Sequence, residues 1–244
     1  MKYIIDTGFF GLSALADAKD AFGSSLLAVT VAPDCANYEE VVSAVVGALN
    51  GVPVYAGATK PTLRDDTPKE YAPETPAVKA EGTEHASNII ARFAKDEELT
   101  VVCLGPLTNV AIAIMKEPEA MCKIKKIIIA GGAQLGYGYV TETAEYNIYT
   151  DPEAADTVVN SGIPLVFVTP EACAEYRKAA LQFALTPETA TNTYEAFIDI
   201  DVSGSRTYGQ TVVDPIGWNP INNQKHAGEK SLIVAEMKGE CANA

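Results

Sequence analysis

The chain has 244 residues, of which 48% are hydrophobic, so one domain spanning residues 1–244 can bury a large core. The 18 basic and 32 acidic residues give a formal net charge of −14, which argues against binding to nucleic acid or to anionic membranes. The five cysteines form no CxxC pair and no Cys/His cluster, so neither zinc nor a disulfide framework is predicted. The start, Met1–Asp6, fits neither a signal peptide nor a membrane span, and we expect a cytoplasmic protein.

Short apolar runs rich in β-branched residues alternate with longer amphipathic stretches along the chain. The predicted strands are Tyr3–Asp6, Ser25–Val31, Thr100–Leu104, Lys126–Ala130 and Leu165–Val168. The predicted helices are Tyr38–Leu49, Glu84–Lys95, Pro106–Met115, Pro152–Asn160 and Glu171–Ala184. Continuous hydrophobic strands suit a parallel sheet that is covered on both faces. We therefore expect an α/β fold with an open, mostly parallel sheet and helices on both faces.

Other segments depart from this alternation. Lys60–Gly82 is rich in Pro, Asp, Glu and Thr and is predicted to be a long loop. Tyr194–Val202 alternates between apolar and polar residues, which is typical of an antiparallel or edge strand, and Ser231–Met237 is predicted to be a final strand. In open α/β sheets the active residues gather at the carboxyl ends of the strands. In this chain those ends are Asp6-Thr7-Gly8, Ala32-Pro33-Asp34, Leu104-Gly105 and Gly131-Gly132.

Four stretches, in this order, resemble motifs of the nucleoside hydrolase family. They are Val102–Ala111 with its G-P-L-T-N turn, Ile127–Ala133 with its Gly pair, Thr143–Ala155 with A-E-Y-N and D-P-E-A-A, and Tyr208–Asp214 with G-Q-T-V-V-D. Any one of them is ordinary turn or helix-start chemistry. Together, at these spacings, they indicate the family from Lys2 to about Asp214.

The resemblance implies an enzyme that cleaves the bond between ribose and a base. It also implies a calcium ion that holds ribose hydroxyls and a water, and an aspartate that acts as general base. Ca²⁺ takes about 6–8 oxygen ligands, many of them carboxylates. A transition state resembling an oxocarbenium ion is stabilised by buried carboxylates.

The chain departs from the family pattern in two places. The first strand of the family ends in D-T-D-x-x-x-D-D, whereas here Gly8, Leu12 and Ser13 replace the three later acids. The family's H-D pair before the late strands is also missing, because a single predicted helix separates Leu165–Val168 from Leu185–Glu188. We therefore expect no metal site and assign no cofactor, although the resemblance implies calcium.

The remaining pocket residues follow from the resemblance. Asp6 is the candidate catalytic group, because it alone remains of the first-strand acids. Glu145 and Asn147 match residues that bind ribose in the family, while Asp34 and Tyr139 stand where the family has asparagines. These four residues are the candidate substrate-binding groups. The Leu104 carbonyl matches a backbone metal ligand of the family.

The two histidines, His85 and His226, are interpreted as helix-start and loop residues and not as general acids.

Three functions remain open at this point. The first is a degenerate homologue impaired in calcium-dependent hydrolysis. The second is an active, diverged N-ribosyl hydrolase in which Asp6, Asp34 and Glu145 share the tasks of base and electrostatic stabiliser. The third is a subunit that binds ribose or a nucleoside, or that acts as a scaffold for a partner. A homo-oligomer is an expectation from the family.

Overall fold

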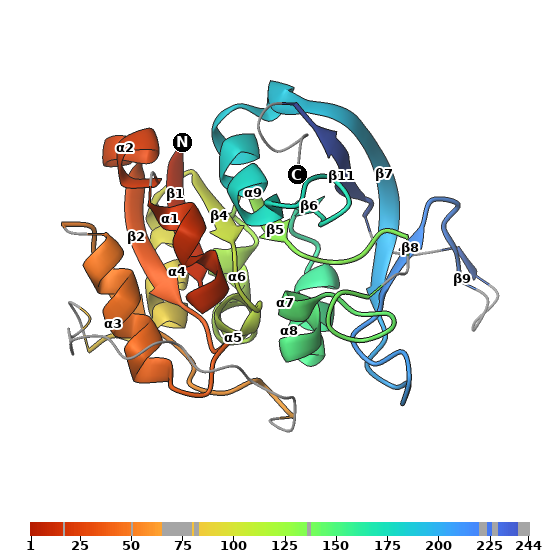
Figure 1. Ribbon diagram of the computed structural model, residues 1–244, viewed down its shortest axis with the longest axis horizontal. Coiled ribbons are helices and arrows are strands. Elements are labelled where there is room, and N and C mark those ends of the chain that lie inside the picture. Colours follow the sequence, from red (N-terminus) through yellow and green to blue (C-terminus); the bar gives the residue numbers. More distant parts are fainter. Residues whose placement is uncertain are drawn as a thin grey trace.

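A nine-stranded sheet organises the chain in the computed structural model, which describes residues 1–16, 18–49, 51–64, 80, 83–135, 138–219, 224–225 and 229–238 (Figure 1). The strand order is β3-β2-β1-β4-β5-β6-β11-β7-β8. The strands are β1 Lys2–Thr7, β2 Leu26–Val31, β3 Val54–Ala56, β4 Leu99–Cys103, β5 Lys126–Ala130, β6 Leu165–Val168, β7 Ala190–Ile200, β8 Thr211–Asp214 and β11 Ser231–Met237. A separate two-stranded ribbon joins β9 Trp218–Asn219 to β10 Gln224–Lys225.

The pairing directions confirm the expected mixed sheet. All neighbours from β3 to β11 are parallel, whereas β7 pairs antiparallel with β11 and with β8. The antiparallel prediction for Tyr194–Val202 is thus confirmed, and the strand begins four residues earlier, at Ala190. In Figure 1, β7 bends along its length and carries β8 at the outer edge of the sheet.

The longer helices lie close to their predicted positions. They are α3 Tyr38–Ala48, α4 Ala86–Asp96, α5 Thr108–Lys116, α8 Pro152–Val159 and α9 Tyr176–Leu185. The shorter ones are α1 Leu12–Leu15, α2 Ala18–Phe22, α6 Pro118–Met121 and α7 Tyr146–Thr150, with 3₁₀ turns at Phe9–Gly11, Gly23–Ser25 and Pro187–Thr189. Three predicted starts are too early: α4 begins two residues after Glu84, α5 two residues after Pro106, and α9 five residues after Glu171. Most of the predicted loop Lys60–Gly82 lies outside the described residues.

Two apolar cores, one on each face of the sheet, hold these layers together. Alternate residues of one strand point to opposite faces, so Ile5 belongs to one core and Ile4 to the other. The Ile5 core is closed by α1, α2, α3 and α9, and the Ile4 core by α4, α5, α6, α8 and the inner side of β7. Coverage of both faces explains why the parallel strands are continuously hydrophobic.

None of the helices in the described residues is long and apolar enough to cross a membrane.

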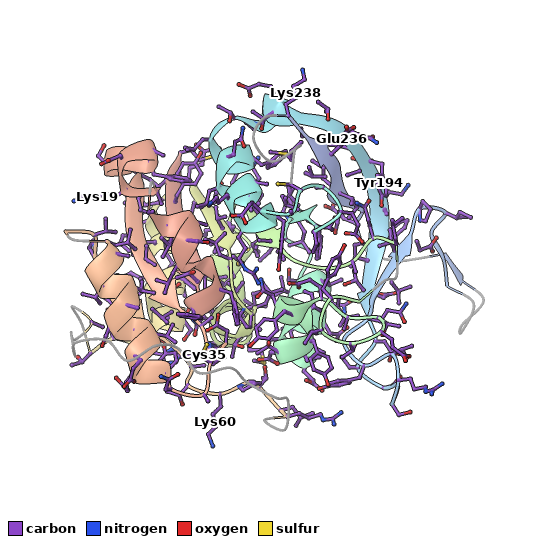
Figure 2. All side chains as sticks on the ribbon, viewed as in Figure 1. Lys19, Cys35, Lys60, Tyr194, Glu236 and Lys238 are labelled. Atoms are coloured by element: carbon purple, nitrogen blue, oxygen red, sulfur yellow. The ribbon has the colours of Figure 1, made fainter. Side chains whose placement is uncertain are left out.

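Figure 2 shows Cys35 close to the loop that follows β2, and Lys60 projecting outward on the same side. Tyr194, Glu236 and Lys238 lie toward the opposite side of that view, beside β7 and β11.

Candidate functional site

The carboxyl ends of β1, β2, β4 and β5 form the edge where the candidate residues meet, here called the strand-end edge. Parallel neighbours end side by side, with Asp6 opposite Thr30 of β2 and Cys103 of β4. The Leu104 amide continues this alignment by donating to the Asp6 carbonyl at 2.7 Å. The loops that leave this edge carry Gly8, Asp34, Leu104 and Gly131.

Asp6 lies below this edge, on the sheet face that carries α5. Its side chain is fully buried. The Oδ1 atom accepts hydrogen bonds from Thr30 Oγ1 at 2.5 Å and from Asn109 Nδ2 at 2.9 Å. The Oδ2 atom has no hydrogen-bond partner within the described part of the chain. Burial raises the pKa of Asp6 to about 7, although the bonds from Thr30 and Asn109 oppose the shift.

Asp34, in the loop after β2, lies against the segment that follows β1. Its carboxylate is fully buried and accepts from the backbone amides of Phe9 at 2.9 Å and Phe10 at 3.2 Å. Burial raises its pKa, while the two amides and the charge of Arg177 lower it. A Cβ atom on Gly8 would lie 2.0 Å from Asp34 Oδ2. Asp34 therefore fills the space that a side chain at position 8 would need.

Glu145 holds the start of α7. Its fully buried carboxylate accepts through Oε2 from the amides of Gly132, Asn147 and Ile148 at 3.0–3.2 Å. Its Oε1 accepts from Tyr176 Oη at 2.6 Å. Because two of these donors are amides of the first turn of α7, Glu145 acts as the N-cap of that helix in this structure.

Asn147 links two strand ends to α9. Its Nδ2 donates to the carbonyls of Leu104 at 3.0 Å and Ala130 at 2.7 Å. Its Oδ1 accepts from Arg177 Nη2 at 3.1 Å. Only 1% of the residue is exposed. Both hydrogens of the amide nitrogen and one lone pair of its oxygen are thus already engaged.

Tyr139 is the exception among the predicted substrate-binding residues, because it lies on the surface with 55% of its area exposed. Its backbone amide donates to the Ala144 carbonyl. Burial of part of the ring and the nearby charges of Glu171 and Glu145 raise the pKa of its hydroxyl.

The sequence reasoning missed Arg177. It lies in the first turn of α9, and its Nε donates to the Leu104 carbonyl at 3.0 Å. Its partners are 73 and 30 residues away in the chain, so no local spacing pattern marks it. His85, by contrast, lies at the start of α4 as predicted, where its Nδ1 accepts from the Ser87 amide at 3.2 Å. His226 lies outside the described residues.

The family model described as inosine-uridine preferring nucleoside hydrolase matches residues 6–188. The chain belongs to this family. The pyrimidine-specific ribonucleoside hydrolase RihB of Escherichia coli O1:K1 / APEC is 30% identical over 221 residues, which cover 68% of this chain and 70% of the relative.

Solved structures of the nucleoside hydrolase fold match almost the whole chain. An inosine-guanosine nucleoside hydrolase aligns with a TM-score of 0.81 and 19% identity, covering 97% of this chain and 94% of that one. A purine-preferring ribonucleoside hydrolase from Gardnerella vaginalis aligns with a TM-score of 0.78 and 20% identity, covering 98% and 94%. At these identities the match establishes the fold alone.

The residues at the strand-end edge do not fit the calcium ion of nucleoside hydrolases. Within the described segments no group of three or more His, Cys, Asp or Glu side chains could hold a metal ion. Leu12 packs against the core and Ser13 lies exposed on α1, so neither replaces an acid. The Leu104 carbonyl, with two lone pairs, already accepts from Asn147 and Arg177. A metal ion there would have to displace both donors.

Proposed function

We propose that this chain is a nucleoside hydrolase-family protein that is impaired in calcium-dependent cleavage of the N-glycosidic bond of ribonucleosides. The proposal is carried by one observation: Glu145 and Asn147, which correspond to ribose-binding residues, have their polar atoms engaged by partners within the chain. A sugar hydroxyl would gain little from groups that must first give up internal hydrogen bonds.

The acid–base chemistry supports the same conclusion. Cleavage of an N-glycosidic bond requires a base for the attacking water and negative charge near the developing oxocarbenium ion. Asp34 is tied to the amides of Phe9 and Phe10, and Glu145 to the start of α7. Neither carboxylate is free to turn toward a water without breaking a cap or a loop.

The decisive experiment measures ribose release from a panel of purine and pyrimidine nucleosides at high protein concentration. It is run with calcium and again with chelator, with the Escherichia coli RihB relative as positive control. We expect no release from this chain in either condition. Release that the chelator abolishes would overturn the proposal. A thermal-shift screen of the same nucleosides and of ribose detects binding without turnover.

A second candidate, an active and diverged N-ribosyl hydrolase, is favoured by Asp6 alone. A buried carboxylate with an unpaired oxygen and a pKa near 7 has the properties of a general base at neutral pH. On this hypothesis ribose release is independent of calcium, and Asp6→Asn or Asp34→Asn abolishes it. Unchanged rates in both variants would dispose of this candidate.

A further inference from the structure

Arg177, in the first turn of α9, brings a positive charge to the strand-end edge, where it contacts the carbonyl of Leu104. Helix α9 connects β6 to β7, and only 16% of the Arg177 side chain is exposed. A guanidinium removed from water to this extent is costly unless hydrogen bonds and counter-charges compensate.

The surroundings of Arg177 supply that compensation. Its Nε donates to the Leu104 carbonyl at 3.0 Å and its Nη2 donates to Asn147 Oδ1 at 3.1 Å. The same Nη2 lies 3.9 Å from Glu145 Oε1. The planar group stacks near two rings, with Cζ 4.6 Å from the centroid of Tyr176 and 5.8 Å from that of Phe10. These contacts orient the fork of the guanidinium toward the strand ends.

Two buried carboxylates interact electrostatically with this cation. Glu145 is fully buried, and the Arg177 nitrogen 3.9 Å away provides it with a counter-charge. Asp34 is also fully buried, and the charge of Arg177 lowers its pKa against the opposing effect of burial. Through its bonds to Leu104 and Asn147 and its ion pair with Glu145, the cation joins the end of β4 and the start of α7 to α9.

We propose that the Arg177 guanidinium is the fixed cation of the strand-end edge and stands in place of a divalent metal ion there. It holds a backbone carbonyl, an amide oxygen and a carboxylate, which are oxygen groups of the kinds that calcium binds. A calcium ion beside it would meet like charge and would find the Leu104 carbonyl engaged. This inference deepens the proposed function, because it names the charge that replaces calcium at the same site.

The first test is calorimetric titration of the full chain with calcium chloride, with thermal unfolding measured in calcium and in chelator. We expect no binding heat in the millimolar range and the same Tm in both solutions. Saturable calcium binding with a higher Tm would overturn the inference. Ribose release is a separate readout: calcium-independent release would favour the second candidate, the diverged hydrolase, and leave this inference standing, whereas release that needs calcium would overturn the proposed function.

The second test separates the charge of Arg177 from its hydrogen bonds. Arg177→Lys keeps a point charge without the fork, and Arg177→Gln keeps an amide donor without the charge. We expect Arg177→Gln to lower Tm by about 5–10 °C and Arg177→Lys to lower it less. The matched control is Lys178→Gln, since Lys178 is the exposed neighbour on the same helix, and its Tm should stay within about 2 °C of wild type.

Chemical rescue completes the test. Arg177→Ala removes the whole guanidinium, and millimolar methylguanidinium should raise the Tm of this variant, whereas equal concentrations of sodium or urea should not. Wild type and the Lys178→Gln control should show no such gain. Equal Tm for the Arg177→Lys and Arg177→Gln variants, or rescue by sodium alone, contradicts a role as the site's cation.

Discussion

The two sides of the strand-end edge differ in how many residues of the family's motifs they keep. On the side of β1, the positions of the missing acids are Gly8, Leu12 and Ser13, and Asp34 occupies the space beside Gly8. On the side of α5, α7 and α8, the motif residues are present. The difference lies in the partners that each set has within the fold.

Two of the motif residues that are present, Asp151 and Asn109, support the architecture. Asp151 caps α8 by accepting from the Ala154 amide, and it also accepts from Thr62 and Thr108. Asn109 donates to Asp6 Oδ1 and to the Val31 carbonyl, and accepts from the Ala58 amide. These residues would be needed even if no substrate ever bound.

The comparison teaches how to interpret a partly matched motif. A polar residue that caps a helix or ties two strands contributes to stability, because its removal leaves buried groups unpaired. An acid whose only partner would be a metal ion makes no such contribution to stability. In this chain Gly8 stands at one such position, and Asp34 fills the space beside it. A family motif can therefore persist on architectural grounds alone.

The largest expected effect concerns the β1 side of the strand-end edge, where Asp34 fills the space beside Gly8. Restoring an acid with Gly8→Asp places a side chain 2.0 Å from Asp34 Oδ2, and it adds a second buried anion beside the first. We expect a loss of unfolding free energy of about 4 kcal/mol or more, measured by urea denaturation.

A double variant, Gly8→Asp with Asp34→Ala, clears that space and is the control for this prediction. It should recover part of the loss. If Gly8→Asp alone is as stable as wild type, Asp34 does not fill the position and the comparison fails.

The second prediction concerns the side of α5, α7 and α8, where the motif residue Asn147 is present. Asn147→Ala leaves the carbonyls of Leu104 and Ala130 without their side-chain donor and takes a partner from Arg177. The expected loss of unfolding free energy is about 2–4 kcal/mol. The exposed Asn160, whose side-chain amide donates to the carbonyl and the carboxylate of Asp156, is the matched control, and Asn160→Ala should cost less than about 1 kcal/mol.

The third prediction concerns pH. Because the pKa of Asp6 is raised to about 7 in the folded chain, the folded state binds this proton more tightly than the unfolded state. The stabilisation is complete below about pH 4 and is lost as pH rises through about 7. We expect Asp6→Asn to reduce the loss of unfolding free energy between pH 5 and pH 8 by about 1–3 kcal/mol. Parallel pH curves for the two proteins would contradict a raised pKa.

The smallest effect is expected at Tyr139. The ring is 55% exposed, so Tyr139→Ala should change the unfolding free energy by less than about 0.5 kcal/mol. If a nucleoside produces a thermal shift with wild type, loss of that shift in this variant would mark Tyr139 as a binding residue. A large loss of stability would place it among the supporting residues instead.

The regular elements were predictable because their signals are local. The β5, β6 and β11 ranges match the prediction, since runs of β-branched residues are bounded by clear breaks. The three-residue strand Val54–Ala56 and the five-residue helix Tyr146–Thr150 were missed, because such short elements are stabilised by their neighbours and not by periodicity.

The candidate site was predictable only in part. Motif resemblance identified Glu145 and Asn147, and their burial and internal bonds appear only in three dimensions. The resemblance assigned Asp6 the catalytic role, and the structure places it under α5 with Thr30 and Asn109. The fork of Arg177 reaches Leu104 across 73 residues of chain, a pairing that no sequence pattern encodes.

The position of β11 has a consequence for how the chain reaches its folded state. This strand comes after all the others in the sequence, yet it lies between β6 and β7 in the sheet. Among the strands that the structure describes, β7 and β8 therefore join the parallel strands only by way of β11. During synthesis on a ribosome, the antiparallel part must wait, with its pairing edge open, until Ser231–Met237 has emerged. The sheet is completed by insertion at its middle and not by growth at its edge.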